Sequence, residues 1–206
     1  GETKYPGDID LPDQAYMKVL FSHRPHARVK SIDISKAEAL PGVVAVFTAK
    51  DVPVNEYGLI MPDQPVLCGP GSSKPGADIV RCVCDQVALV VADSEEAAAA
   101  AVKLIEITYE DLPVIADVYK AREAGALQLH EHAEGNVLVH YRIRHGDMEA
   151  GWRQAEVVIE GEYHTGYQEH AYLQPEAGLG YLDDEGRLTV VVAGQWAHED
   201  REQIAH

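Results

Sequence analysis

The sequence predicts an α+β protein, in which short strands form a mixed sheet and a few helices pack against it. Three observations favour this class: apolar runs separated by turn signals, one clear helix between two strands at residues 85–110, and further strand and helix patterns after residue 136. With 206 residues and 46% hydrophobic residues, the chain is long enough to bury a sizeable core.

Three strands are predicted in the first part of the chain, at 15–22, 27–34 and 42–49. The first two flank the segment that contains His23, Pro25 and His26. The third, GVVAVFTA, is apolar enough to be buried on both faces.

Two helices are predicted near these strands. A short helix over 35–40 opens with serine, a good N-cap residue, and ends before a Pro-Gly pair. The alanine run of 94–105 has high helix propensity, and Ser94 can cap it. Strands at 85–92 and 106–110 flank this second helix, so we expect it to pack on one face of a sheet.

The remaining segments are predicted from their turn residues and periodicity. Residues 52–78 are rich in proline and glycine, which predicts a long excursion of turns with one strand at 65–68. Residues 119–136 have little periodic pattern and are predicted to connect two domains. The elements predicted after this connector are strands at 137–144 and 156–168, a helix at 146–155, a hairpin of 176–182 and 187–194 around a turn at 183–186, and a helix at 198–206. No stop signal follows the last helix, so we expect the sequence to be truncated within the second domain.

The net charge of −17 argues against binding to nucleic acid or to anionic membrane surfaces, which require clustered lysine and arginine. No apolar run approaches the length of a membrane span, and no signal or transit peptide is recognisable. Because the chain begins without Met, we expect it to be processed or cut from a longer one.

Cysteine usage indicates a reducing compartment. Cys68, Cys82 and Cys84 are an odd number of cysteines, which argues against a disulfide framework and favours the cytoplasm. Cys82 and Cys84 are expected to share one face of a strand as small buried thiols.

Two pairs of histidines are candidate metal ligands. His23 and His26 flank Pro25, which prevents a regular helix, and residues three apart on a strand point to opposite faces. The spacing therefore predicts a corner of the fold. His130 and His132 lie in the connector, where a solvated loop explains them. A small metal-binding protein that uses this pair with Cys82 and Cys84 is the weakest interpretation.

No local pattern identifies an active site by itself. The sequence lacks a nucleophile elbow, a phosphate-binding glycine loop and a dinucleotide fingerprint. The densest polar cluster is HTGYQEHAYLQPEAG at 164–178. A polar strand edge followed by a loop explains it as well as a functional site does. Asp183 and Asp184 are explained by the predicted turn.

Three stretches of the chain carry a resemblance to a known family. They are SHRPHARVKSIDISKAEALPGVVAVFTAKDVP at 22–53, DQVALVVADSEEAAAAAVKLIEITYEDLPVIAD at 85–117, and HGDMEAGWRQAEVVIEGEYHTGYQEHAYLQPEAGLGY at 145–181. The first two resemble the α/β hammerhead domain of the molybdenum hydroxylases, which include xanthine dehydrogenases and aldehyde oxidases. The third resembles the start of their molybdenum-binding domain. The resemblance implies a hammerhead domain at 1–118, a connector at 119–136, and the N-terminal, truncated part of a molybdopterin-binding domain at 137–206.

The resemblance also implies an activity. It is that of an oxidoreductase that hydroxylates an aldehyde or N-heterocycle, with water as the oxygen source. A molybdenum centre held by a pterin cofactor, molybdopterin or its cytosine dinucleotide, takes the electrons. Iron–sulfur clusters and FAD on partner domains or subunits receive them next. The implied partners are these units, the remainder of the large subunit and a small-molecule substrate, with neither nucleic acid nor a membrane. This chain alone is expected to be inactive.

One cofactor-binding residue follows from the resemblance. The family has a glutamine near the apical oxo ligand of the metal, and VVVAGQW places Gln195 there. An amide can donate a hydrogen bond to that ligand without adding charge. Gly194 replaces a more usual hydroxyl residue, and Gln174 stands where relatives often carry an acidic one. The family's catalytic glutamate and its glycine-rich pterin segments lie beyond residue 206, so no catalytic residue and no metal ligand is assigned.

An alternative to the enzyme subunit is a non-catalytic assembly module that docks onto iron–sulfur or flavin subunits. The proline- and glycine-rich excursion at 52–78 would suit such docking, since long loops often cover a partner surface. The two interpretations differ in whether the encoded chain continues past residue 206.

Overall fold

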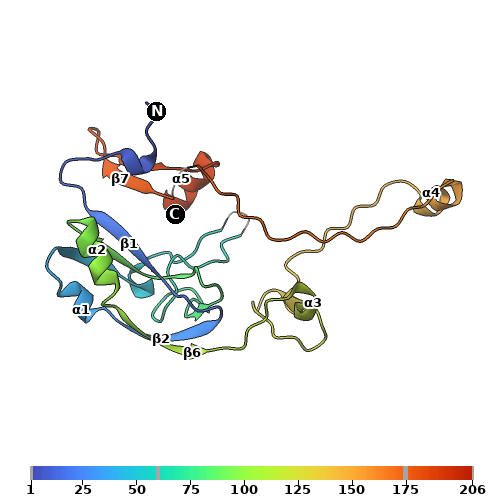
Figure 1. Cartoon of the computed structure of the whole chain (residues 1–206), viewed down its shortest axis with the longest axis horizontal. Helices are drawn as coiled ribbons and strands as arrows, with labels where there is room; N and C mark the ends of the chain where they lie inside the picture. Colours follow the sequence, from blue (N-terminus) through green and yellow to red (C-terminus); the bar gives the residue numbers. More distant parts are fainter. Residues whose placement is uncertain (1, 59–60, 174–175, 206) are drawn as a thin grey trace. The chain divides into compact units, whose positions relative to one another are not determined.

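The chain divides into two compact units; Figure 1 shows the chain, with labels on several of its helices and strands. One consists of Gly1–Asp117 with Glu176–His206, and the other of Val118–Pro175. The residues described by this computed structural model are 2–58, 61–173 and 176–205. The predicted α+β class is confirmed, because short helices accompany small sheets. The single mixed sheet is corrected: the described strands pair antiparallel, in two three-stranded sheets and a hairpin.

The first sheet has β5 (Gln86–Ala92) at its centre, between β1 (Tyr16–Phe21) and β3 (Val43–Phe47). β5 is almost entirely apolar because both of its faces are covered, as a central buried strand requires. Val90 belongs to the core on one side, and Val87 belongs to the core on the other. This strand therefore joins the two hydrophobic clusters of the unit.

Two helices cover the first face. α2 (Glu95–Val102) packs against all three strands of this sheet, and the short α1 (Ser35–Glu38) packs against β3 and α2. Ala98 and Ala101 are fully buried, and their small side chains let α2 lie close to the sheet. The core residues on this side are Ala37, Val46, Ala88, Val90, Ala92, Ala98, Ala101 and Ile105.

The N-caps of these helices confirm one prediction and correct another. The Ser94 hydroxyl accepts a hydrogen bond from the Ala97 N–H at 3.3 Å, as expected for the cap of α2. Ser35 is the first helical residue of α1, and the N-cap is Ile34. The carboxylate of Asp33 accepts from the Ser35 N–H at 3.0 Å, so an acidic residue two positions earlier satisfies the donor that an N-cap would serve.

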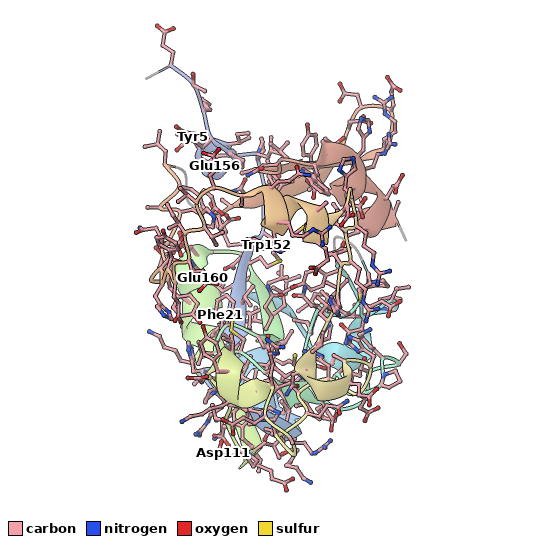
Figure 2. All side chains as sticks on the ribbon, turned by 90° about the vertical axis from the view of Figure 1, so that its right-hand side faces the viewer. Tyr5, Phe21, Asp111, Trp152, Glu156 and Glu160 are labelled. Carbon is pink, nitrogen blue, oxygen red and sulfur yellow. A yellow bond between two sulfur atoms is a disulfide. The ribbon has the colours of Figure 1, made fainter. Side chains whose placement is uncertain are left out.

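The second sheet has β2 (Ala27–Asp33) between β4 (Ile79–Val80) and β6 (Glu106–Asp111). Figure 2 labels Asp111, at the end of β6, and Phe21, at the end of β1. The core against this sheet contains Ala27, Val29, Cys68, Val80 and Val87. Both sheets thus share one continuous interior, with β5 contributing to each side.

Residues 52–78 form the excursion of turns that the sequence predicts, after the short 3-10 helix η2 (Ala49–Asp51). The strand predicted at 65–68 is absent from the described residues. A single antiparallel bridge joins Tyr57 and Gln64 instead. Proline lacks the N–H that a strand ladder needs, and the prolines on both sides of Gln64 explain why pairing stops there.

The same unit contains the predicted hairpin and final helix. β7 (Gly178–Leu182) pairs with β8 (Leu188–Val192), and α5 (Ala197–Ala205) follows. The 3-10 helix η1 (Pro6–Asp8) packs against β7, so the start of the chain contacts this late hairpin. Among the described residues, no helix combines the length and apolar character needed to cross a membrane.

The second unit contains α3 (Val118–Ala121), the 3-10 helix η3 (Glu134–Asn136) and α4 (Met148–Gln154). Asn136 organises the predicted connector. Its amide donates to the carbonyl oxygens of Ala121 and Leu127, each at 2.8 Å. Its side-chain oxygen accepts from the Leu129 N–H at 2.9 Å. One side chain therefore closes a loop that has no sequence periodicity.

The strands predicted at 137–144 and 156–168 are not formed, and this is a correction. Both segments are extended and exposed, with the predicted helix, α4, between them (Figure 1). Figure 2 labels Trp152 on α4 and Glu156 and Glu160 after it. A strand needs a neighbour to satisfy its backbone N–H and C=O groups, and no described residue pairs with these segments.

Candidate cofactor site

The β7–β8 hairpin that leads to Gln195 is fixed by one carboxylate. Asp183 Oδ1 accepts from the N–H groups of Glu185 and Arg187 at 3.0 and 2.9 Å, and Oδ2 accepts from Arg187 Nε at 2.8 Å. The backbone and side-chain hydrogen bonds from Arg187 hold the pKa of Asp183 below its usual value. Gly186 adopts a φ of +75°, which a glycine tolerates in such a turn. The predicted turn role of Asp183 is confirmed.

Gln195 lies in the short segment between the end of β8 at Val192 and the start of α5 at Ala197. Its side chain is exposed and makes no hydrogen bond to another described residue. The amide is therefore available as a hydrogen-bond donor to a group outside this chain. A cofactor contact at Gln195 stays a prediction.

Gly194, next to Gln195, is approached closely by a carboxylate. A Cβ added at this glycine would clash with Oδ2 of Asp200, on α5. The space that a hydroxyl side chain would fill is thus taken by Asp200. Sequence reasoning did not anticipate this approach of Asp200 to Gly194.

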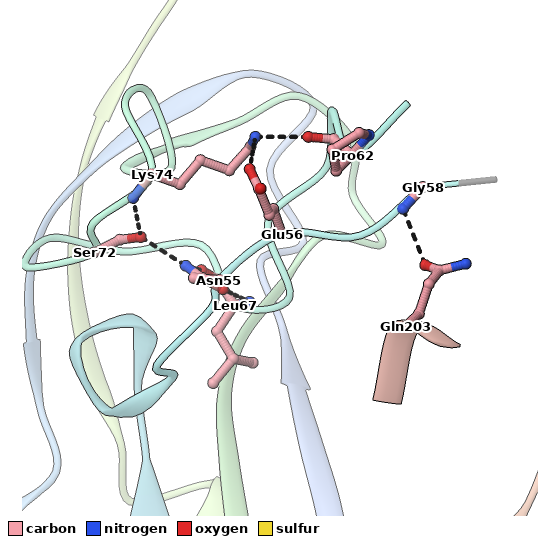
Figure 3. A network of polar contacts seen from close by, with 8 residues as sticks. All are labelled: Asn55, Glu56, Gly58, Pro62, Leu67, Ser72, Lys74 and Gln203. Atoms are coloured by element: carbon pink, nitrogen blue, oxygen red, sulfur yellow. Dashed lines mark hydrogen bonds and ion pairs between the residues drawn. The ribbon is translucent and has the colours of Figure 1, made fainter. Parts of the chain in front are cut away.

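A buried polar network holds the 52–78 excursion in place (Figure 3). Asn55 is 1% exposed, and its amide donates to the Leu67 carbonyl and to Ser72 Oγ, each at 2.8 Å. Its side-chain oxygen accepts from the Leu67 N–H at 2.9 Å. Both polar atoms of this buried side chain therefore have hydrogen-bond partners within the loop.

Lys74 adds a second anchor to the same loop. Its Nζ donates to Glu56 Oε2 at 3.0 Å and to the Pro62 carbonyl at 2.8 Å, while its N–H donates to Ser72 Oγ at 3.0 Å. The Lys74 side chain is mostly buried, which strengthens this ion pair relative to one on the open surface. The two halves of the excursion are joined in this way.

The excursion also contacts the helix that follows Gln195. Gly58 N–H donates to Gln203 Oε1, on α5, at 3.1 Å (Figure 3). Gln203 in turn lies one helical turn from Glu199, to which its amide donates at 3.4 Å. Sequence reasoning missed this connection because no local pattern relates two residues separated by 145 positions.

The dense polar cluster at 164–178 does not converge on one point. His164 pairs with Glu162 at 3.0 Å, and the ring of His170 stacks on Tyr172 with centroids 5.5 Å apart. These are contacts between near neighbours on an exposed segment. Gln174, whose replacement of an acidic residue was noted in the sequence, lies outside the described residues.

The two histidine pairs are accounted for differently. His26 is buried and its Nδ1 donates to the Pro113 carbonyl at 2.6 Å, while His23 is exposed with a φ of +52°. The rings of His130 and His132 lie 5.4 Å apart, between centroids. Within the parts of the chain that the structure describes, no three His, Cys, Asp or Glu side chains are grouped to hold a metal ion.

The prediction of two buried free thiols at Cys82 and Cys84 is wrong. The two residues form a disulfide, with Cα atoms 5.2 Å apart, and they lie in a turn that ends at Asp85. The turn arises because the Asp85 carboxylate accepts from the Arg81 and Cys82 N–H groups, at 2.5 and 3.1 Å. A strand would have placed both sulfurs on one buried face, whereas the turn leaves Cys84 exposed.

Comparison with family models assigns both parts of the chain. Residues 1–113 match the model described as the a/b hammerhead domain of aldehyde oxidase and xanthine dehydrogenase. Residues 129–206 match the molybdopterin cofactor-binding domain. The chain belongs to the aldehyde oxidase and xanthine dehydrogenase family. The expected membership of the molybdenum hydroxylases is thereby confirmed.

Relatives of this family are similar over the whole chain. A probable xanthine dehydrogenase subunit from Bacillus subtilis is 40% identical over 206 residues, which are 100% of this chain and 26% of that protein. A nicotinate dehydrogenase large molybdopterin subunit from Eubacterium barkeri is 35% identical over 100% of this chain and 46% of its own length. The chain thus spans less than half of each of these two relatives.

A solved structure of an aldehyde oxidoreductase is also similar to this chain. The aldehyde oxidoreductase of Desulfovibrio desulfuricans matches 91% of this chain and 21% of its own, with a TM-score of 0.73 and 27% identity. This similarity supports the hammerhead assignment of the α+β fold.

The residues present fit a cofactor of this family in one respect. The exposed Gln195 amide can donate a hydrogen bond without supplying charge, which suits a metal whose ligands come from the cofactor itself. Gln195 stays the predicted contact to such a cofactor, in the segment between β8 and α5.

Proposed function

We propose that this chain is part of the molybdenum-binding subunit of an oxidoreductase that hydroxylates an aldehyde or an N-heterocycle, with water as the source of oxygen. Two family models that match in sequence order support this proposal. The names of the relatives, which include xanthine and nicotinate dehydrogenases, favour an N-heterocycle as substrate. In this proposal residues 1–118 are the hammerhead domain, 119–136 the connector and 137–206 part of the molybdopterin-binding domain.

The observation that carries the proposal is the placement of Gln195. Its amide is exposed directly after β8, in the region that matches the cofactor-binding model. When bound, the molybdenum–pterin cofactor would supply the two-electron oxidation chemistry. Gln195 would donate a hydrogen bond to it and fix its orientation, while Asp183 holds the turn of the hairpin that precedes Gln195.

The proposal includes partners. Electrons would leave through iron–sulfur clusters and FAD on other domains or subunits, and the rest of the large subunit would complete the cofactor pocket. The chain of residues 1–206 alone would be inactive, since no residue within it is assigned as the catalytic base. A cytoplasmic location belongs to the same proposal.

The test uses the full-length protein that carries this chain. Molybdenum content is measured by elemental analysis, together with intact mass. Turnover of xanthine, nicotinate and an aldehyde is then followed in isotopically labelled water with an artificial electron acceptor. We expect about one molybdenum per subunit and incorporation of the label into the product of at least one substrate.

The variant Gln195→Ala tests the assigned residue. We expect activity to fall about 10- to 100-fold with molybdenum content unchanged, because a lost outer-shell hydrogen bond has effects of this size. Gln64→Ala is the matched control, since Gln64 is also an exposed glutamine whose side chain makes no hydrogen bond to another described residue. Equal activity of the two variants would show that Gln195 is not part of the cofactor site. A protein with neither molybdenum nor turnover would favour the assembly module.

A further inference from the structure

We propose that Cys82 and Cys84 form a reversible dithiol–disulfide site, which exchanges with small-molecule or protein thiols at the surface of the hammerhead unit. The structure contains the oxidised form, in which the two sulfurs are bonded across one intervening residue. Neither the proposed hydroxylase chemistry nor Gln195 depends on this site.

The turn that carries the cysteines is held without help from the disulfide. Val83 and Asp85 carbonyls accept from the N–H groups of His23 and Ser22, at 3.1 and 2.8 Å. Ser22 Oγ donates to the Cys82 carbonyl at 2.9 Å. Reduction would leave these hydrogen bonds in place, so the two thiols would stay close together and reoxidise readily.

A short disulfide of this kind contributes little to the stability of the fold. Closing a loop of so few residues removes little entropy from the unfolded chain, which is the main way a disulfide stabilises. Exposed disulfides of low structural benefit are the ones that exchange with thiols most easily. The backbone bonds of the turn, and not the disulfide, therefore account for the local structure.

The two sulfurs differ in accessibility, which gives the exchange a direction. Cys84 is exposed and Cys82 is half-buried, with the exposed Val83 between them at 52%. An incoming thiol can thus reach the Cys84 sulfur first. The Cys84 N–H points to Cys82 Sγ, at 3.4 Å, and would stabilise the thiolate that leaves.

The reaction is a two-electron exchange. A thiolate RS⁻ attacks Cys84 Sγ, forms an R–S–S–Cys84 bond and breaks the bond to Cys82, which leaves as a thiolate and takes up a proton from solvent. A second RS⁻ attacks the outer sulfur of that mixed disulfide and releases the Cys84 thiolate. The protein gains two electrons and two protons, and the small thiols become R–S–S–R.

The third cysteine provides an internal control. Cys68 is buried, and burial raises its pKa to about 12, so very little of it is thiolate near neutral pH. Thiolate is the reactive form, and Cys68 should therefore resist alkylation in the folded protein. Any reagent that labels only the Cys82–Cys84 turn reports the proposed site.

The experiment incubates the folded full-length protein in glutathione buffers of graded reduction, quenches it with an alkylating agent and maps the labelled peptides by mass spectrometry. We expect Cys82 and Cys84 to become labelled together as glutathione rises, and to be protected again after oxidised glutathione is added. Labelling of Cys84 should be at least about 100-fold faster than that of Cys68. Cys68→Ser should leave the titration unchanged.

The variant Cys82→Ser tests the direction of the exchange. It removes the sulfur that would displace glutathione from Cys84, so we expect a mixed disulfide at Cys84 that the wild-type protein does not accumulate. A bridge that resists millimolar glutathione until the protein is unfolded would overturn the proposal. Free thiols at both positions that oxidised glutathione fails to join would overturn it as well.

Discussion

Asn55 is the most deeply buried polar side chain of the network that holds the long excursion. It makes its three hydrogen bonds to Leu67 and Ser72 while almost completely buried. Removing either side of such a buried hydrogen bond lowers the stability of the fold. The group left behind is unpaired, and water cannot reach it to replace the lost bond. A sequence of turns without regular structure is thereby held in one conformation.

We expect Asn55→Ala to lower the free energy of unfolding by about 1 to 3 kcal/mol, because it leaves the buried backbone groups of Leu67 unpaired. Ser72→Ala removes one of the three bonds and should cost less. Urea unfolding monitored by circular dichroism measures both. Equal stability of Asn55→Ala and wild type would mean that the loop is held by other contacts.

Gly194 lies close to the Asp200 carboxylate. A side chain at residue 194 would therefore require the Asp200 side chain to move. We expect Gly194→Ser to destabilise the protein, and Asp200→Ala to relieve part of this effect. The coupling in a double-mutant cycle should be about 1 kcal/mol. Gly180→Ser is the control, because nothing lies within 4 Å of a Cβ added there. Strictly additive effects would contradict the contact.

At the scale of elements, α2 is defined by its own sequence more than any other helix here. It has an N-cap at Ser94, two glutamates in its first turn and an alanine face that packs on the sheet. Lys18 Nζ on β1 lies 2.7 Å from Glu95 Oε1 and links the helix to the strand beside it. The hydrogen bond and charge of Lys18 hold the pKa of Glu95 below its usual value.

This shift predicts an acid dependence of stability. Because the pKa of Glu95 is lower when folded, its contribution is present at pH values above the ordinary glutamate pKa and is lost as the pH falls through the lowered pKa. We expect the free energy of unfolding to fall less on acidification in Glu95→Gln than in the wild type. The difference should be small because Lys18 and Glu95 are both exposed. Urea unfolding between neutral pH and about pH 3 measures it, with Glu96→Gln as control. Identical acid profiles for Glu95→Gln and wild type would contradict the expectation.

At the scale of the whole molecule, two segments have the pattern of strands without the structure of strands. Along 156–168, Val157, Ile159, Tyr163 and Tyr167 occupy alternate positions and are exposed, Ile159 at 87%. The alternation is that of a strand with one buried face. Since the chain spans 26% of one relative and 46% of another, we infer that residues outside these 206 provide the neighbouring strands.

The same replacement on the two faces of this segment tests the inference. In the full-length protein, Ile159→Ser should cost about 2 kcal/mol of stability, because an isoleucine there would be buried. Glu160→Ser, on the opposite face, should be close to neutral. In the chain of residues 1–206 both variants should behave alike. Amide hydrogen exchange provides a second measurement, and an unprotected segment 156–168 in the full-length protein would contradict the proposed strand.

The sequence by itself determined the elements whose stabilising contacts are local. The alanine helix with its Ser94 cap and the hairpin closed by Asp183 and Gly186 were both predicted. Each depends on propensity, capping or turn geometry within a few residues. The family was evident for the same reason, since its three stretches are continuous in the sequence.

Tertiary structure decided what depends on residues far apart. Burial of Asn55, the contact from Gly58 to Gln203 and the approach of Asp200 to Gly194 leave no periodic signal, because the partners are brought together only by folding. The turn at Cys82–Cys84 is organised locally by Asp85, but folding joins it to the Ser22–His23 corner by further hydrogen bonds. The extended segments 137–144 and 156–168 show the converse: a strand pattern stays unpaired where no described residue offers a neighbouring strand, because backbone hydrogen bonds in a sheet are made between segments and not within one.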